Sequence, residues 1–372
     1  MPKNAIVVGA GIVGLSTARA LAEQGWFVTV YERSAAAQGA SIRNFGMIWP
    51  IGQKSGRQYE RAMRTKSIWK QICQETGYWI EESGSLHLAK SDEEKLTMQE
   101  LGDLFSKERP VQWVSAAQIA QITDAPRQAN LLGGLWSSDE AIVESRLIIR
   151  DMPVYLQEKY SIRFNFHHVV TNVGTGFIQV ENKRIEADLV FICNGADFQT
   201  LYSEVYNSYF VKCKLQMMRL IEQPSKWRIG PSICGGLSLA HYKSFEIASS
   251  LQLLKEKLYE NYPLYFNYGI HVMVSQNHLG QLTIGDSHEY GDNIEPFDKS
   301  MVNELVINYL KDLVQFKDWT VIQTWNGEYA KLSNGGTEFL HEVEPGVWIV
   351  NGFGGAGMTL ALGTVEEFCQ QF

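Results

Sequence analysis

A chain of 372 residues with 45% hydrophobic and 12% aromatic residues is long enough for two domains and apolar enough to exclude a disordered protein. Its formal net charge of −8 opposes nucleic acid or an anionic membrane as the main partner. Five scattered cysteines without C-x-x-C spacing give no sign of a structural zinc site and are typical of reduced thiols. Because no apolar run is long enough to span a bilayer and the first predicted strand begins at Ala5, we expect a cytoplasmic protein without a signal peptide.

A glycine-rich turn near the start of the chain is the first motif. Residues 5–14 read Ala-Ile-Val-Val-Gly-Ala-Gly-Ile-Val-Gly, in which four apolar residues of a buried strand lead into the pattern G-x-G-x-x-G. Gly9 permits the tight turn, Gly11 lets the backbone approach a pyrophosphate, and Gly14 allows a helix to pack on the strand. The N-terminus of that helix offers unpaired N–H groups, so we expect a phosphate-containing ligand here.

The residues after this turn favour a dinucleotide as the ligand. A helix is predicted over residues 15–24, and the apolar residues 27–31 predict a second strand. Glu32 follows at once, about 20 residues beyond the glycines, where a carboxylate accepts hydrogen bonds from ribose hydroxyls. The next loop carries side chains suited to a phosphate-rich ligand, namely Ser41, Arg43 and Asn44.

The middle of the chain predicts a second structural unit. Alternating side chains over residues 79–89 predict a hairpin, residues 91–107 an amphipathic helix with a Ser/Asp/Glu cap, and a further helix ends at Tyr160. Between residues 202 and 319 the composition becomes aromatic and β-prone, with one long helix over 300–316. These features predict an antiparallel sheet that covers the nucleotide unit and forms the roof of a substrate site.

The chain returns to the nucleotide unit between these parts. Residues 167–181 predict a β-meander, and the fully apolar strand 188–192 is expected to join the sheet of the first strand. It runs into Asn194-Gly195, where we expect a second contact with the cofactor. The two neighbouring histidines at the start of the meander would point to opposite faces of a strand, so we predict no metal site.

The end of the chain carries a second glycine-rich turn. Residues 346–351 predict a strand, residues 352–359 contain four glycines, and residues 360–371 predict a helix. Such a turn again permits close approach of the backbone and directs a helix N-terminus at a ligand. Two such turns at opposite ends of the chain favour one long cofactor that contacts both.

Taken in order along the whole chain, these motifs resemble those of the glycine oxidase, sarcosine oxidase and D-amino-acid oxidase superfamily of FAD enzymes. The matching segments are residues 9–32, 40–44, 188–196, 284–286 and 352–359. The resemblance implies an α/β chain, α+β overall, with a Rossmann-like FAD-binding domain and a second, mainly antiparallel substrate domain. We expect a discontinuous FAD-binding domain of residues 1–78, 136–201 and 320–372, and a substrate domain of residues 79–135 and 202–319.

The resemblance also implies which residues hold FAD. The predicted cofactor contacts are Gly9, Gly11, Ile12, Val13, Gly14, Glu32, Arg33, Ser41, Arg43, Asn44, Val170, Asn194, Gly195, Gly327, Phe353, Gly354, Gly355, Ala356, Gly357, Met358 and Thr359. The residues up to Arg33 would hold the ADP part, Val170 would contact the adenine region, and Gly354 to Thr359 would reach the flavin ring. No cysteine lies near residues 325–329 in the sequence, where some relatives attach flavin, so we expect non-covalent FAD.

A narrower resemblance concerns the substrate. Residues 40–52 and 193–197 are similar to a branch of the superfamily associated with phosphonate breakdown, which is thought to oxidise aminophosphonates such as N-methylated 2-aminoethylphosphonate. Amino-acid oxidases of the superfamily often carry Gly-Leu-Arg-Pro where this chain has Gly-Glu-Tyr-Ala at 327–330, and the lysine of sarcosine oxidases is matched by Thr359. The cation that binds a substrate carboxylate is therefore missing, and a non-carboxylate amine fits better. Other candidates to bind an anion are Arg43, Lys54, Lys331, His241 and His271.

We expect oxidation of a small amine by hydride transfer from the carbon next to a neutral nitrogen to flavin N5, followed by hydrolysis of the imine. This chemistry needs no acid–base pair if the pocket lowers the pKa of the amine, so no catalytic residue is predicted. The predicted substrate pocket comprises Arg43, Met217, His241 and Tyr329. Two alternatives stay open: a hydroxy-acid dehydrogenase with His241, His271 or His288 as base, and a non-catalytic nucleotide-binding sensor.

Overall fold

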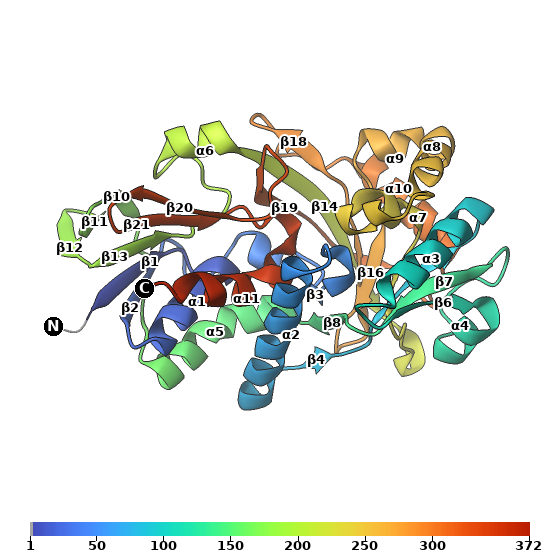
Figure 1. The fold of residues 1–372 in the computed structure, drawn as a ribbon, viewed down its shortest axis with the longest axis horizontal. Coiled ribbons are helices and arrows are strands. Elements are labelled where there is room, and N and C mark those ends of the chain that lie inside the picture. Colours follow the sequence, from blue (N-terminus) through green and yellow to red (C-terminus); the bar gives the residue numbers. More distant parts are fainter. Residues whose placement is uncertain (1–2) are drawn as a thin grey trace.

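Two large β-sheets form the framework of the protein in the computed structural model, which describes residues 3–372 (Figure 1). The helices are α1 (Ile12–Glu23), α2 (Arg57–Thr76), α3 (Asp92–Phe105), α4 (Ala116–Ile122), α5 (Ser145–Tyr160), α6 (Ser203–Tyr209), α7 (Gly236–His241), α8 (Leu251–Asn261), α9 (Pro263–Asn267), α10 (Ser300–Leu313) and α11 (Gly357–Cys369). Short 3₁₀ turns are η1 (Ala40–Ile42), η2 (Pro50–Gly52), η3 (Pro224–Lys226), η4 (Lys243–Ile247) and η5 (Gly354–Ala356). The predicted fold class, α/β with a second and mainly antiparallel sheet, is confirmed.

The first sheet contains the nucleotide unit predicted from the glycine pattern. Its six strands lie in the order β20 (Phe339–Glu344), β21 (Val347–Asn351), β13 (Leu189–Ile192), β1 (Asn4–Val8), β2 (Phe27–Glu32) and β9 (Arg163–Phe166). All neighbours are parallel except β20 and β21. The predicted placement of the apolar strand 188–192 beside the first strand is therefore confirmed, and both glycine-rich turns leave this sheet.

Strand β1 is apolar throughout because both of its faces are covered. Ala5 and Val7 pack into a core with residues of α1, α2, α5 and α11, whereas Ile6 and Val8 pack on the opposite face. That opposite face is covered by α6 and by a small antiparallel sheet of β10 (Val170–Gly174), β11 (Phe177–Val180) and β12 (Lys183–Glu186), which is the predicted meander. A run without polar alternation thus predicted the strand's position correctly.

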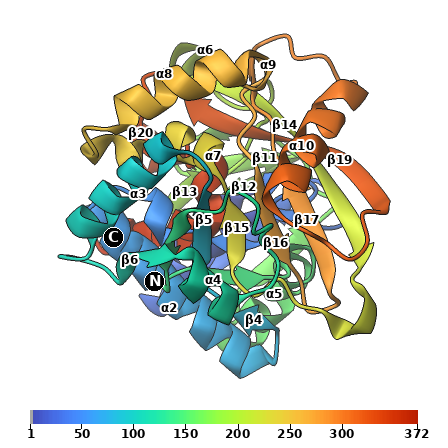
Figure 2. The same cartoon turned by 90° about the vertical axis from the view of Figure 1, so that its right-hand side faces the viewer.

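The second sheet has nine strands and is mainly antiparallel. Its order is β18 (Glu289–Gly291), β14 (Phe210–Glu222), β17 (Gln281–Gly285), β16 (Met273–Gln276), β15 (Ser232–Cys234), β5 (Ser85–Ala89), β7 (Gly133–Ser137) and β6 (Val111–Ser115), with β19 (Val321–Leu332) paired to β14. Figure 2 shows α3, α8 and α10 around β15, β16 and β17, and their apolar side chains share one core. Strand β19 begins the segment 320–372 and connects this sheet to the first one.

Helix α3 illustrates how local sequence sets an element boundary. The hydroxyl of Ser91 accepts a hydrogen bond from the N–H of Glu94 at 3.2 Å, and the Glu94 carboxylate accepts one from the N–H of Ser91 at 3.0 Å. These reciprocal bonds satisfy two donors that a helix N-terminus otherwise leaves unpaired, so the chain enters the helix at Asp92. The predicted cap is therefore confirmed.

Two predicted elements differ from the structure. The hairpin over 79–89 is wrong, because β4 (Ile80–Glu81) pairs with β8 (Ala141–Val143) in a small sheet with β3 (Met47–Ile48), whereas β5 pairs with β7 and β15. Alternation indicates an extended strand but carries no information on its partner. The last helix begins at Gly357 rather than at residue 360, since the glycines continue from η5 directly into α11. None of the helices formed by residues 3–372 is long and apolar enough to cross a bilayer.

Candidate functional site

The glycine turn after β1 is constrained by close backbone contacts. Gly9 has φ +105°, and a Cβ there would lie 2.5 Å from the carbonyl oxygen of Cys193 on the neighbouring strand. A Cβ on Gly14 would lie 1.9 Å from the carbonyl oxygen of Gly9. Real Cβ contacts do not come this close, so both positions require glycine, and Gly14 serves to pack α1 against the turn.

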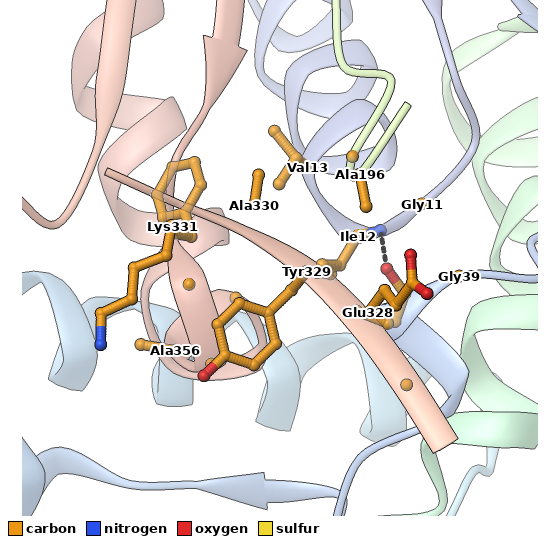
Figure 3. Close-up of a pocket in the computed structure, with 18 of the residues that line it drawn as sticks. Gly11, Ile12, Val13, Gly39, Ala196, Glu328, Tyr329, Ala330, Lys331 and Ala356 are labelled. Atoms are coloured by element: carbon orange, nitrogen blue, oxygen red, sulfur yellow. Dashed lines mark hydrogen bonds between the residues drawn. The ribbon is translucent and has the colours of Figure 1, made fainter. Parts of the chain in front are cut away.

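Helix α1 begins at this turn with its N-terminus directed at a large cavity. The N–H of Ile12 donates to the hydroxyl of Ser41 at 2.9 Å, a bond that Figure 3 draws. Glu32, at the end of β2, accepts from the N–H of Ala10 and from the N–H of Ser34, both at 2.9 Å. The carboxylate therefore joins the turn to the loop after β2 on the wall of the cavity.

The second glycine turn ends beside the first. Gly352 and Gly354 have φ of +83° and +54°, and a Cβ on Gly357, the first residue of α11, would lie 3.3 Å from the side chain of Ile12. The N-termini of α1 and α11 therefore meet although they are about 345 residues apart in the sequence. Figure 3 shows Ile12 and Ala356 around the same pocket.

One cavity of about 1150 Å³ brings the predicted residues together. Of the predicted cofactor contacts, all line this cavity except Gly14, which lies within α1 behind the turn. The four predicted substrate residues line it as well. Sequence positions from 8 to 359 thus contribute to a single elongated site between the two sheets.

Several of these side chains have protein partners within the site. The guanidinium of Arg33 pairs with Asp197 at 2.6 Å, so its charge is already compensated at the mouth of the cavity. The Asn194 side chain donates to the carbonyl of Asp197 at 2.6 Å. The hydroxyl of Thr359 accepts from the N–H of Trp49 at 2.9 Å, so this side chain holds η2 against α11. Thr359 therefore stabilises the contact between η2 and α11, a role that its alignment with a lysine of sarcosine oxidases did not suggest.

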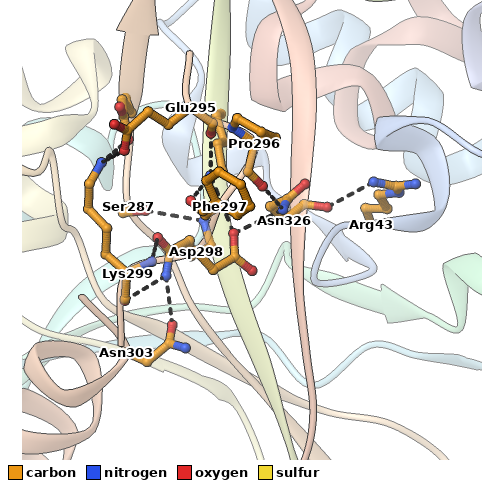
Figure 4. A network of polar contacts seen from close by, with 12 residues as sticks. Arg43, Ser287, Glu295, Pro296, Phe297, Asp298, Lys299, Asn303 and Asn326 are labelled. Atoms are coloured by element: carbon orange, nitrogen blue, oxygen red, sulfur yellow. Dashed lines mark hydrogen bonds and ion pairs between the residues drawn. The ribbon is translucent and has the colours of Figure 1, made fainter. Parts of the chain in front are cut away.

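Arg43 belongs to a polar network rather than pointing freely into the cavity. It donates to the carbonyl of Asn326 at 3.1 Å, and the Asn326 amide donates to Asp298 at 2.9 Å (Figure 4). The buried ammonium of Lys214 donates to the carbonyls of Glu295 at 2.8 Å and of Phe297. The segment 292–299 is thereby fastened across β14 and β19 close to Arg43.

The far end of the cavity, beside the second glycine turn, has an aromatic and polar wall. Tyr329 of β19 is buried, and its ring lies 3.7 Å from the position of a Cβ on Gly354 or Gly355. Lys331, two residues on along β19, donates to the hydroxyl of Tyr290 at 2.8 Å. Burial lowers the pKa of Lys331. Met217 lies on β14, opposite Trp325 of β19, and also lines this end.

Three histidines meet at the same end. The ring centroids of His241 and His271 are 3.8 Å apart, and that of His288 lies 4.6 Å from His241. Burial lowers the pKa of His241 and His271 well below the ordinary value and that of His288 to about 4, so the rings are neutral at pH 7. Burial also raises the pKa of the neighbouring carboxyl of Asp286 well above its usual range. The sequence named the histidines as separate candidates and gave no sign that they gather.

The sequence missed other residues of the site. Asp286, Tyr242 and Tyr290 line the cavity beside the histidines. The available signals were the matching segment 284–286, which ends at Asp286, and the position of Tyr242 directly after His241. Cys213 lies opposite Tyr329 in the pairing of β14 with β19. The sequence did not indicate this contact, because the two residues are far apart along the chain. The Cys213 side chain is buried and lies outside the cavity wall formed by the described residues. His167 and His168 lie between β9 and β10 rather than within one strand.

Comparisons with known proteins agree with this site. A family model described as FAD dependent oxidoreductase (DAO) matches residues 4–371. The tRNA 5-methylaminomethyl-2-thiouridine biosynthesis bifunctional protein MnmC of Azoarcus sp. (strain BH72) is 31% identical over 150 residues, which are 38% of this chain and 23% of that protein. The chain thus spans less than a quarter of this curated relative.

Solved structures share the fold at low sequence identity. Glycine oxidase from Geobacillus kaustophilus has a TM-score of 0.77 at 16% identity, with 99% of this chain and 95% of that chain covered. Dithionite-reduced L-alpha-glycerophosphate oxidase from Mycoplasma pneumoniae, with FAD bound, has a TM-score of 0.74 at 14% identity, with 100% and 95% covered.

The residues of this structure fit FAD. Two helix N-termini and two glycine turns border one elongated cavity, so backbone N–H groups are available to an anionic pyrophosphate. At Gly195 a Cβ would have no atom of the described residues within 4 Å, and its φ of +60° requires glycine at the rim of the cavity. The backbone at Gly195 therefore leaves room for a cofactor to approach closely.

Proposed function

Because the chain belongs to the FAD dependent oxidoreductase (DAO) family and is thus an FAD enzyme rather than a nucleotide sensor, we propose that it oxidises a small amine. Bound FAD supplies the acceptor for the hydride that leaves the carbon next to nitrogen. The chain supplies binding, orientation and a dry environment. Residues 9–14, Glu32 and the loop 40–44 would hold the nucleotide half of FAD, and the turn 352–359 would contact its redox ring.

The observation that carries this proposal is geometric: one cavity joins the two glycine turns to a wall that contains Tyr329, Met217 and Lys331. Burial at the far end of the cavity lowers the pKa of the Lys331 ammonium group. The same environment disfavours the charged form of a bound substrate amine, because desolvation acts on any ammonium in the same direction. A neutral amine has the nitrogen lone pair that assists loss of hydride from the adjacent carbon. The site thus prepares the reactive form of an amine without a dedicated base.

Names of relatives support amine chemistry of this kind. MnmC is named for a methylaminomethyl group, and the glycine oxidase is named for a primary amine substrate. A tRNA substrate suits this chain poorly, because its net charge is −8. From the names of the relatives we therefore infer that the substrate contains a small amino group, but not that it is a nucleic acid. The proposed partner is a small-molecule amine.

The proposed substrate class is an amine that carries an anion other than an α-carboxylate. Tyr329 stands where amino-acid oxidases of the superfamily often carry arginine, and the charge of Arg33 is already paired with Asp197. Arg43 is held by the carbonyl of Asn326. An aminophosphonate such as N-methylated 2-aminoethylphosphonate fits this arrangement, with Lys331 and the three histidines as its nearest polar partners. FAD is proposed to be non-covalent, since the buried Cys213 is not among the residues that line the cavity.

A hydroxy-acid dehydrogenase remains the second candidate, and one observation favours it. The three neutral histidines could accept a hydroxyl proton, and one structural relative is named as a glycerophosphate oxidase. That relative is only 14% identical, so it supports the fold and leaves the substrate to experiment.

An anaerobic screen of flavin bleaching tests the proposal. N-methyl amines, aminophosphonates, α-amino acids and hydroxy acids are each mixed with the FAD-loaded enzyme, and loss of the flavin absorbance is timed. We expect aminophosphonates to bleach the flavin fastest. Faster bleaching by an α-amino acid would overturn the proposed substrate class, and bleaching by hydroxy acids alone would overturn amine oxidation.

A pair of variants sharpens the assignment of Tyr329. Tyr329→Arg introduces the guanidinium that amino-acid oxidases carry, so the ratio of bleaching rates for glycine over an aminophosphonate should rise. Tyr329→Phe keeps the ring and adds no charge, so the same ratio should stay near that of the wild type. Equal changes in both variants would show that the position does not select the anion.

A further inference from the structure

His241, His271 and His288 form a cluster that the oxidation of an amine does not require. They come from the end of α7, from the segment before β16, and from the connection between β17 and β18. One ring nitrogen of each lies within 4.8 Å of the others. His271 and His288 are buried and His241 is partly exposed to the cavity.

The backbone holds two of these rings in place. The N–H of His271 donates to the carbonyl of Asp286 at 3.2 Å, and the N–H of Asp286 donates back to the carbonyl of His271 at 3.0 Å. The N–H of His288 donates to the carbonyl of Tyr268 at 3.0 Å. His271 and His288 therefore lie on segments that flank β16 and β17 and are held by backbone hydrogen bonds, and a rigid base is what a ligand site needs.

Hydrogen bonding fixes which ring nitrogens are free to bind. Nδ1 of His288 lies 2.9 Å from the carbonyl oxygen of Gly269. A carbonyl can only accept, so Nδ1 carries the proton and Nε2 keeps its lone pair. Nε2 of His288 lies 3.9 Å from a carboxyl oxygen of Asp286.

Asp286 stands in a supporting position behind His271. Its Oδ1 atom lies 3.1 Å from Nε2 of His271 without the alignment of a good hydrogen bond. Nδ1 of His271 is buried and has no hydrogen-bond partner among residues 3–372. A carboxyl group close to one ring nitrogen and an unpartnered second nitrogen resemble the arrangement by which proteins orient metal-binding histidines. An unpartnered buried nitrogen is costly unless a ligand satisfies it.

We propose that His241, His271 and His288 together bind one divalent transition-metal ion, with Zn²⁺ as the representative. Three imidazole nitrogens suit zinc, copper, nickel or iron and not magnesium or calcium, which prefer oxygen. Bonds of about 2.0–2.1 Å put the nitrogens of a tetrahedral zinc site roughly 3.3 Å apart, so the rings close by roughly 1.5 Å at most.

The site leaves a coordination position that faces the cavity. The ring of His288 lies 6.4 Å from that of Tyr329, which in turn borders the second glycine turn. A metal with three protein ligands keeps a fourth position for an outside ligand. Resting on the proposed function, this position binds an anionic oxygen of the substrate and replaces the guanidinium that the chain lacks.

Metal content of the purified enzyme is the direct test. Untagged, FAD-loaded protein is dialysed against a chelator, incubated with ZnCl₂ and analysed for zinc per flavin. We expect one zinc per flavin in the wild type and affinities at least about 100-fold weaker in His271→Gln and His288→Gln, because even supporting residues contribute 10–100-fold. His341→Gln is the matched control, since His341 is exposed on β20 of the other sheet.

Flavin content of each variant reports whether it has folded. A second measurement uses the wild type alone: Cu²⁺ added to it should give an EPR spectrum with nitrogen hyperfine structure from imidazole ligands. A wild type that binds no zinc and shows no such spectrum would overturn the inference, as would equal zinc loss in the His341→Gln control. Flavin bleaching by amines without zinc binding would overturn the metal site alone, and zinc binding without amine bleaching would overturn the proposed amine oxidation while leaving the metal site in place.

Discussion

The sharpest prediction concerns the acid sensitivity that His87 gives to the fold. This histidine lies on β5 between the rings of Trp49, at 5.9 Å, and Phe245, at 5.4 Å. It is completely buried, and neither ring nitrogen has a hydrogen-bond partner in the part of the chain that the structure describes. Burial lowers its pKa from 6.5 to about 3. The perturbation is the change His87→Leu, combined with a shift from pH 7 to pH 5.

The direction of the pH effect on stability follows from which state of the protein binds the proton. Between pH 6.5 and about 3 the unfolded chain holds a proton on His87 that the native protein does not, so stability falls as the pH falls through this range. Each pH unit below the ordinary pKa of 6.5 lowers the free energy of unfolding by about 1.4 kcal/mol, so at pH 5 His87 alone lowers it by about 2 kcal/mol. Leucine cannot bind a proton, and it leaves no buried polar atom unpaired.

Urea unfolding of the FAD-loaded protein at both pH values measures this difference. From pH 7 to pH 5 the wild type should lose about 2 kcal/mol more than His87→Leu. His341→Leu, a change on an exposed histidine of β20, should lose as much as the wild type. Parallel losses in the wild type and His87→Leu would refute the claim that His87 is neutral and desolvated in the native state.

Two further predictions concern the cofactor site and its surroundings. Gly14→Ala places a Cβ 1.9 Å from the carbonyl oxygen of Gly9, so α1 must shift, at a cost of about 1–3 kcal/mol of folding free energy. The Kd for FAD, measured by flavin fluorescence, should therefore rise roughly ten-fold or more. Gly39→Ala is the control, because the space at its Cβ is open and the Kd should change little. Lys214→Met removes the ammonium group that binds the carbonyls of the segment 292–299. Amide hydrogen exchange in that segment should therefore become faster, while the affinity for FAD stays unchanged. An unchanged exchange rate would contradict the role given to the network of Figure 4.

The sequence by itself determined the parts of the site that are made from consecutive residues. The turn at residues 9–14 and the turn at 352–359 were predicted because glycine spacing, a preceding apolar strand and a following helix are local features. Apolar runs without alternation also predicted which strands are buried on both faces, so β13 could be placed beside β1. These segments alone predict a long, phosphate-containing cofactor, and the resemblance of the whole set of motifs to the superfamily implies that it is FAD.

Only the tertiary structure decided how distant segments meet. The approach of His271 to His288 depends on the pairing of β16 with β17, and His241 reaches them from the end of α7. The pairing of Cys213 with Tyr329 depends on the register of β14 and β19. Strand register is set by the packing of whole sheets and not by local periodicity, so it leaves no signature in a short window of sequence. The same reason explains why 79–89 was predicted as a hairpin although its two strands belong to different sheets. The nucleotide half of the site can thus be predicted from short segments of sequence. The substrate half is made of residues that only the tertiary structure brings together.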